Sequence, residues 1–93
     1  MTSFMELFTA SMQESCSGSI NVLSESDIDP SEFINEAMQI YVNEGPHKAN
    51  SFLDAKLLEH KHDINATRAI RYVFSTAITI YRRLRNTITI IIE

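Results

Sequence analysis

The chain has 93 residues, of which 44% are apolar and 22% are charged, and it contains two glycines and two prolines. This composition is typical of one small globular domain and argues against an intrinsically disordered chain. The net charge is −4, but residues 1–54 hold nine acidic residues against Lys48, whereas residues 55–93 hold seven basic residues against three acidic ones. Such a dipolar chain can attract itself, or it can show a basic face to an acidic partner.

The single cysteine, Cys16, has no partner for an internal disulfide, which suits a reducing cytosol. It lies in a polar run without basic neighbours, so we expect an unreactive thiol. The N-terminus carries Glu6 and no basic residue, unlike a signal peptide. No apolar run approaches the roughly 18–20 residues of a membrane span. We therefore expect a soluble cytoplasmic protein that does not contact a membrane.

Residues 1–29 are predicted to form a weak N-terminal helix followed by a flexible arm. The serine-rich segment 13–27 has little hydrophobic periodicity and is typical of a linker. The remainder, residues 30–93, is predicted to be a helical dimerisation domain. The short amphipathic pattern that precedes the linker consists of Phe4, Met5, Leu7, Phe8 and Met12.

The strongest local signal predicts a helix over residues 30–44. Asp29 is suited to cap it, Pro30 fits its first position, and Glu32 stands where a capping box places a carboxylate. Gly45 and Pro46 then end the helix. Its apolar face consists of Ile34, Ala37, Met38 and Tyr41.

A shorter helix is predicted over residues 51–61. Ser51 and Asp54 resemble an S-x-x-D cap, and the apolar face is made of leucines. The polar run "HKHD" interrupts the pattern at the end of this helix. His60 and His62 point to different faces of a helix and lack zinc-site spacing, so we expect a solvated surface rather than a metal site.

A long helix follows, for which Asp63 or Asn65 can serve as the cap. Its apolar residues recur at spacings of 4, 3, 4, 3 and 4, the a/d pattern of a heptad repeat. We expect this helix to reach about Asn86 and the β-branched tail 87–92 to fray, extend or pair. The predicted fold is all-α, a small helical hairpin or bundle with a long C-terminal helix, and a homodimer. The predicted dimer interface consists of Ile70, Phe74, Ala77, Tyr81, Leu84 and Ile88.

No arrangement of residues indicates catalysis. The sequence has no glycine-rich phosphate loop and no G-x-S-x-G motif, and its paired carboxylates are explained by helix capping. We therefore predict a non-enzymatic protein with no catalytic residue, cofactor, metal or small-molecule substrate.

A cluster of arginines on the long helix is the main concentration of positive charge in the sequence. Arginine binds phosphate through its planar fork, so the cluster can contact nucleic acid or a protein partner. It can equally pair with the acidic residues of helix 30–44, within one subunit or across two. Both interpretations stay open. The cluster consists of Arg68, Arg71, Arg82, Arg83 and Arg85.

Several short blocks resemble a known family. Ala37 and Gly45 stand eight apart, "SFLDAKLL" (51–58) and "DINATRAIR" (63–71) follow, and Tyr81 lies further down the last helix. This pattern is similar to the small enterobacterial YmgB/AriR and YcgZ group of biofilm and acid-resistance regulators, also described as two-component-system connectors. The segment "RRLRNTITIIIE" after Tyr81 is longer and more basic than the resemblance leads us to expect.

The resemblance implies a dimeric, all-helical regulator that acts on a sensor-kinase phosphorelay, with a nucleoid-type DNA-binding role as a second activity. Our leading expectation is therefore a non-enzymatic adaptor that works by protein–protein contact, with itself and a sensor kinase as partners. A nucleoid-type DNA-binding regulator is the second interpretation. An inhibitor of a host enzyme, encoded by a phage or plasmid, is the third.

Overall fold

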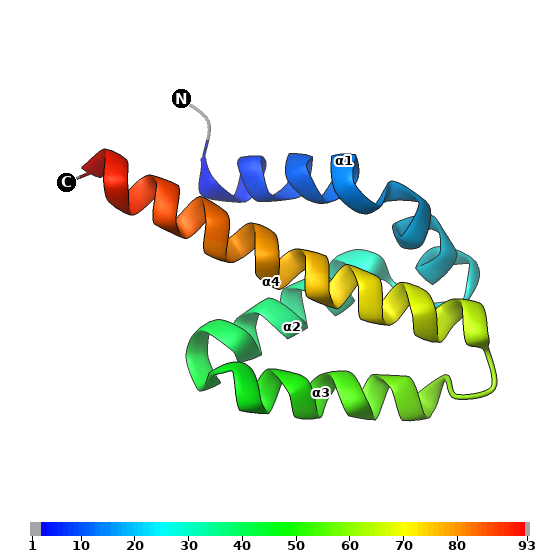
Figure 1. Ribbon diagram of the computed structural model, residues 1–93. Coiled ribbons are helices and arrows are strands. Elements are labelled where there is room, and N and C mark those ends of the chain that lie inside the picture. The colour runs from blue at the N-terminus through cyan, green and yellow to red at the C-terminus, as the bar shows by residue number, and fades with distance from the viewer. Residues whose placement is uncertain (1–2, 93) are drawn as a thin grey trace.

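The computed structural model describes residues 3–92, and it describes the side chains of residues 3–86. Over this range the chain forms the helices α1 (Phe4–Glu25), α2 (Pro30–Glu44), α3 (Pro46–Glu59) and α4 (Ile64–Ile92) and contains no strand (Figure 1). The predicted all-α fold with a long C-terminal helix is confirmed.

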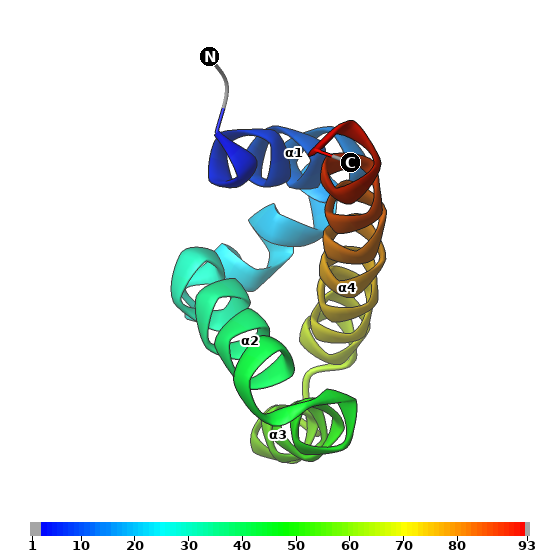
Figure 2. The same cartoon turned by 90° about the vertical axis from the view of Figure 1, so that its left-hand side faces the viewer.

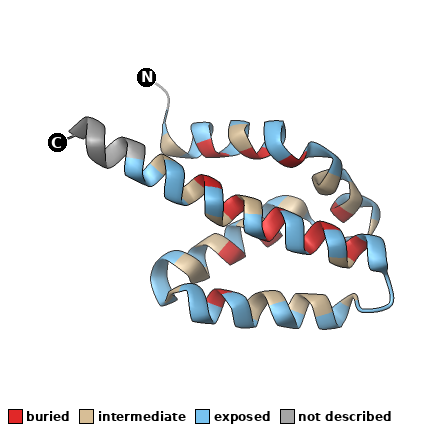
Figure 3. Ribbon diagram, viewed as in Figure 1, coloured by how far each residue is buried: buried red, intermediate tan, exposed pale blue. Residues whose placement is uncertain are grey.

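Helix α4 is the central element of the bundle. It crosses the molecule with α1 on one side and with α2 and α3 on the other (Figure 1). Its buried residues follow one stripe at helical spacing (Figure 3). Three alanines in this stripe leave room for neighbouring helices to approach closely. The stripe consists of Ala66, Ala69, Ile70, Val73, Phe74, Ala77 and Ile80.

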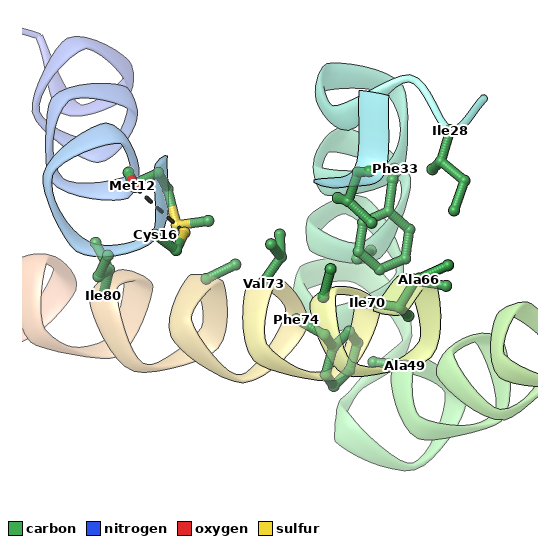
Figure 4. Close-up of a cluster of buried hydrophobic side chains, with 14 of the residues drawn as sticks. Met12, Cys16, Ile28, Phe33, Ala49, Ala66, Ile70, Val73, Phe74 and Ile80 are labelled. Carbon is green, nitrogen blue, oxygen red and sulfur yellow. Dashed lines mark hydrogen bonds between the residues drawn. The ribbon is translucent and has the colours of Figure 1, made fainter. Parts of the chain in front are cut away.

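One hydrophobic core joins all four helices along this stripe. Figure 4 shows Met12 and Cys16 of α1 next to Ile80, and Phe33 of α2 next to Ile70. The Phe33 ring also stacks on Phe52 of α3, with centroids 5.8 Å apart. The core therefore extends along α4, with α1 packed along one side of this helix and α2 and α3 packed along the other.

The boundaries of α2 are those predicted. The carboxylate of Asp29 accepts hydrogen bonds from the backbone N–H groups of Ser31 (3.0 Å) and Glu32 (3.2 Å), which satisfies two donors of the first turn. Pro30 occupies the start of the helix. Gly45 ends it with φ of 95° and ψ of 171°, a conformation that is essentially restricted to glycine.

Helix α3 begins five residues earlier than predicted, at Pro46. Proline ends α2 but is also favoured at the first position of a new helix, because its missing N–H would have no partner there. The predicted cap at Ser51 is therefore wrong. The Ser51 hydroxyl lies inside the helix and donates to the carbonyl of His47 at 3.3 Å.

Helix α4 begins as predicted but extends further. The Asp63 carboxylate accepts from the N–H of Ala66 at 3.1 Å and so caps the first turn. The helix runs to Ile92, beyond the predicted end near Asn86. Each β-branched residue costs only a few tenths of a kcal/mol, which is too little to stop a helix that has already propagated over many turns.

The predicted flexible linker over residues 13–27 is wrong, because α1 continues to Glu25. The weak helix formers leave a kink instead, where Cys16 has φ of −145° and ψ of 35°. The Tyr72 hydroxyl of α4 donates to the Ser15 carbonyl beside this kink, at 3.3 Å. Burial against α4 compensates for low helix propensity. The buried residues of α1 are Phe8, Met12, Cys16 and Leu23.

A Schellman motif closes α1. The N–H of Ile28 donates to the carbonyl of Leu23 at 2.9 Å, and the N–H of Asp27 donates to the carbonyl of Ser24 at 3.2 Å. Asp27 takes the left-handed conformation, with φ of 60°. Leu23 and Ile28 are both buried, so the motif directs the chain from α1 into α2.

The kink region gives a test of these helix assignments. Gly18 lies within α1, and a Cβ atom at this position meets no heavy atom within 4 Å. We expect Gly18→Ala to raise the free energy of unfolding by about 0.5–1 kcal/mol, because alanine is the better helix former.

Gly45→Ala is the matched control, because its backbone conformation excludes alanine. We expect it to lower the free energy of unfolding by about 1–3 kcal/mol. Urea titration followed by circular dichroism measures both values. A Gly18→Ala variant that is less stable than wild type contradicts a helical residue 18.

Candidate functional site: a groove between α1 and α2

A groove separates α1 from α2 because the two helices pack on different neighbours. Helix α1 packs chiefly against α4, and α2 packs chiefly against α3. Seen from the end of the molecule, α4 lies on one side and α1 and α2 diverge from it (Figure 2). Two hollows of about 310 Å³ and about 270 Å³ lie between them and share Met5, Phe8 and Asn35, so they form one groove.

The groove has an apolar surface. Phe8 and Met12 are buried at its base, whereas Met5 and Val42 are 56% and 53% exposed. Large apolar side chains that share one hollow and face solvent mark a binding surface more often than isolated ones do. The apolar residues of the groove are Phe4, Met5, Phe8, Met12, Ile20, Pro30, Ile34, Met38, Val42 and Tyr81.

Methionine contributes three of these residues, Met5, Met12 and Met38. Its unbranched, polarizable side chain adapts to different partner shapes, which is why methionine is frequent on surfaces that bind helices. Neutral polar side chains accompany the apolar ones along α2, namely Asn35, Gln39 and Asn43. The chemistry of the groove is therefore that of a binding surface with a polar margin.

An aromatic cluster fixes one end of the groove. Tyr81 of α4 makes edge-to-face contacts with Phe4 of α1 at 5.6 Å and with Tyr41 of α2 at 5.8 Å. The Arg82 side chain donates through Nε to the Tyr41 hydroxyl at 2.8 Å, and its guanidinium lies 5.8 Å from the Tyr41 ring. These contacts hold α1, α2 and α4 together and set the separation of α1 and α2 at this end.

The predicted dimer interface lies largely inside the chain itself. Ile70, Phe74 and Ala77 are at most 4% exposed, and they belong to the core described above. Tyr81 and Leu84 are partly buried against the same core, and the side chain of Ile88 lies outside the described residues. A partner subunit can reach the three buried residues only if the core opens, and the homodimer stays a prediction.

The five predicted contact arginines, Arg68, Arg71, Arg82, Arg83 and Arg85, are all exposed on α4. Four of them, all but Arg83, share one side of the helix by their spacing. Arg82 does reach α2, but through the Tyr41 hydroxyl rather than through a carboxylate.

The buried thiol fits the predicted role of Cys16. The residue is 4% exposed, and its Sγ donates to the Met12 carbonyl at 3.2 Å. Burial raises the pKa of the Cys16 thiol, which lowers the fraction of reactive thiolate at neutral pH. Cys16 is therefore a packing residue at the kink of α1.

Two absences hold for the described part of the chain. Among its side chains, no three His, Cys, Asp or Glu residues lie together in a way that can hold a metal ion. None of its helices combines the length and the apolar character needed to cross a bilayer.

Neither Val42 nor the groove was predicted from the sequence. A second apolar stripe on α2, Ile34, Met38 and Val42, repeats every four residues and lies beside the core-facing residues Phe33 and Ala37. The apolar residues of α2 therefore cover more than one face of the helix, and this excess was the sequence signal for the groove.

Comparison of the chain with protein-family models, with curated proteins and with solved structures gives no match. The resemblance to the YmgB/AriR and YcgZ group therefore remains an expectation from short sequence blocks.

Proposed function

We propose that this protein is a non-enzymatic regulatory adaptor of the cytoplasm that acts by protein–protein contact, with the groove between α1 and α2 as its docking surface. The observation that carries the proposal is the apolar groove with its exposed Met5 and Val42 side chains. An apolar groove of this kind binds the apolar face of a partner helix in one of the common modes of peptide recognition.

The dimensions of the groove support a helical partner. Its α2 side extends over residues 30–43, which corresponds to about 20 Å at the rise of an α-helix. A partner helix of about 13 residues matches this length. The described lining contains no carboxylate, imidazole or thiol, the groups that acid–base and nucleophilic catalysis most often use. This composition favours binding over catalysis.

The resemblance to biofilm and acid-resistance regulators supplies our candidate for the pathway. We take the partner to be a component of a sensor-kinase phosphorelay that controls biofilm and acid-stress genes. A homodimer is compatible with this role, provided that the two subunits meet through a surface other than the buried stripe of α4.

Substitution of Val42 tests the docking surface. We expect Val42→Gln to abolish capture of the protein partner from an extract of the native host, because it removes an exposed apolar group from the groove without disturbing the core. Leu58→Gln is the matched control, since Leu58 is 67% exposed on α3 and does not line the groove. Mass spectrometry of the captured proteins, with and without nuclease treatment of the extract, measures how much partner each variant retains. Equal capture by wild type and both variants refutes the proposal.

A nucleoid-type DNA-binding regulator is the second candidate function. The observation in its favour is that α4 carries five exposed arginines and no acidic residue. Arginine–phosphate contacts release counterions, so such binding depends steeply on salt.

For this candidate, we expect fluorescence anisotropy with a labelled DNA duplex to detect binding at low salt and a loss of binding in the Arg82→Ala/Arg83→Ala/Arg85→Ala variant. The adaptor function predicts no binding at physiological salt. Sequence-independent binding that persists there and disappears in the triple variant favours the DNA-binding function instead.

A further inference from the structure

Acidic side chains follow the outer edge of the groove on α2. Glu36, Gln39 and Asn43 are spaced by three and four residues, so they share one side of the helix. Glu32 lies one turn before Glu36 on the same side. Gln39 and Asn43 line the groove, and all four residues are exposed. Glu32 and Glu36 also border the neighbouring hollow between α2 and α3, so the two carboxylates stand at the outer margin of the groove and not in its lining.

The edge on α1 repeats the arrangement. Glu6, Thr9 and Gln13 have the same spacing of three and four residues, and Thr9 and Gln13 line the groove. Glu6 is exposed and directly follows the groove residue Met5. A carboxylate thus accompanies the apolar surface on both of the helices that form it.

No basic residue of these two helices offsets the charge. Residues 3–44 contain eight acidic residues and no lysine or arginine. Within the described part of the chain, Glu6, Glu32 and Glu36 form no ion pair. Lys56, which lies near Glu32 and Glu36 on the α3 side, pairs with Glu59 at 3.5 Å. The groove is therefore apolar along its middle and negative along both edges.

We propose that the groove binds a basic amphipathic helix of a partner protein, with its apolar face against Met5, Met38 and Val42 and its lysine or arginine side chains along both carboxylate edges. This proposal deepens the adaptor function and rests on it. Complementary charge at the rim of an apolar contact selects partners and speeds their association, and here it selects against acidic helices.

A second copy of this chain is a weaker candidate for the groove. Its α4 is basic, but the apolar stripe of that helix from Ala66 to Ile80 is already buried against its own α1, α2 and α3. A groove ligand needs an apolar face that is still exposed. The described side chains of α4 offer no continuous face of this kind, since Ile64 and Tyr72 are its large exposed apolar residues.

The test uses a fluorescein-labelled helical peptide of about 13 residues, with leucine on one face and lysine elsewhere. A second peptide carries glutamate in place of every lysine. We expect the lysine peptide to bind the full chain and the glutamate peptide not to bind, as measured by fluorescence anisotropy. Binding of the lysine peptide is expected to weaken with added salt, because exposed charges are screened.

Two variants of equal charge separate local from overall electrostatics. Glu6→Gln/Glu32→Gln/Glu36→Gln removes the edge carboxylates, and we expect it to weaken binding of the lysine peptide roughly tenfold, the sum of three exposed pairs. The control variant makes the same net charge change away from the groove and is expected to bind within about twofold of wild type. Its substitutions are Glu14→Gln, Glu25→Gln and Glu44→Gln.

The proposal is overturned if the two peptides bind equally, if neither binds, or if both triple variants lose affinity to the same extent. The proposal is also overturned if a peptide of residues 78–92 of this chain displaces the lysine peptide and the full chain sediments as a dimer. These two results together assign the groove to a second copy of the chain. If Val42→Gln still abolishes capture of the protein partner in that case, the adaptor function is retained. If Val42→Gln does not change capture of the partner, the adaptor function itself is refuted.

Discussion

Burial of the apolar stripe of α4 is the constraint on which the rest of the structure depends. A single helix cannot bury its own stripe, and in this chain α1 covers the stripe from one side while α2 and α3 cover it from the other. Helices α1 and α2 therefore meet α4 without closing on each other. The groove between them is a direct consequence of this arrangement, and the contacts of Tyr81 with Phe4 and Tyr41 join its two walls at one end.

Local chemistry made both ends of α2 and the start of α4 predictable. The cap at Asp29, the glycine conformation at Gly45 and the cap at Asp63 depend on neighbouring residues, so the sequence is sufficient to find them. The second half of α1 depends on distant residues instead. Its serines and Gly18 favour a linker, and burial against α4 is what makes it helical with a kink at Cys16.

The candidate site was harder to predict from the sequence, because it too depends on contacts between distant residues. The heptad spacing of Ile70, Phe74 and Ala77 identifies a buried stripe but does not say which helix covers it. In the structure the covering helices belong to the same chain. The groove contains residues from three helices that are distant in sequence, so the second apolar stripe of α2 indicates an additional contact surface but does not locate the groove. Its carboxylate edges give it a chemical character that an apolar hollow alone lacks.

The central claim is that the groove between α1 and α2 is the docking surface. Methyl NMR of the full chain with labelled methionine tests it most directly, because Met5 and Met38 both line the groove. On addition of the leucine–lysine peptide, the account predicts that the methyl resonances of these two residues shift and saturate together with binding. Saturable binding that leaves both resonances unchanged would contradict the account.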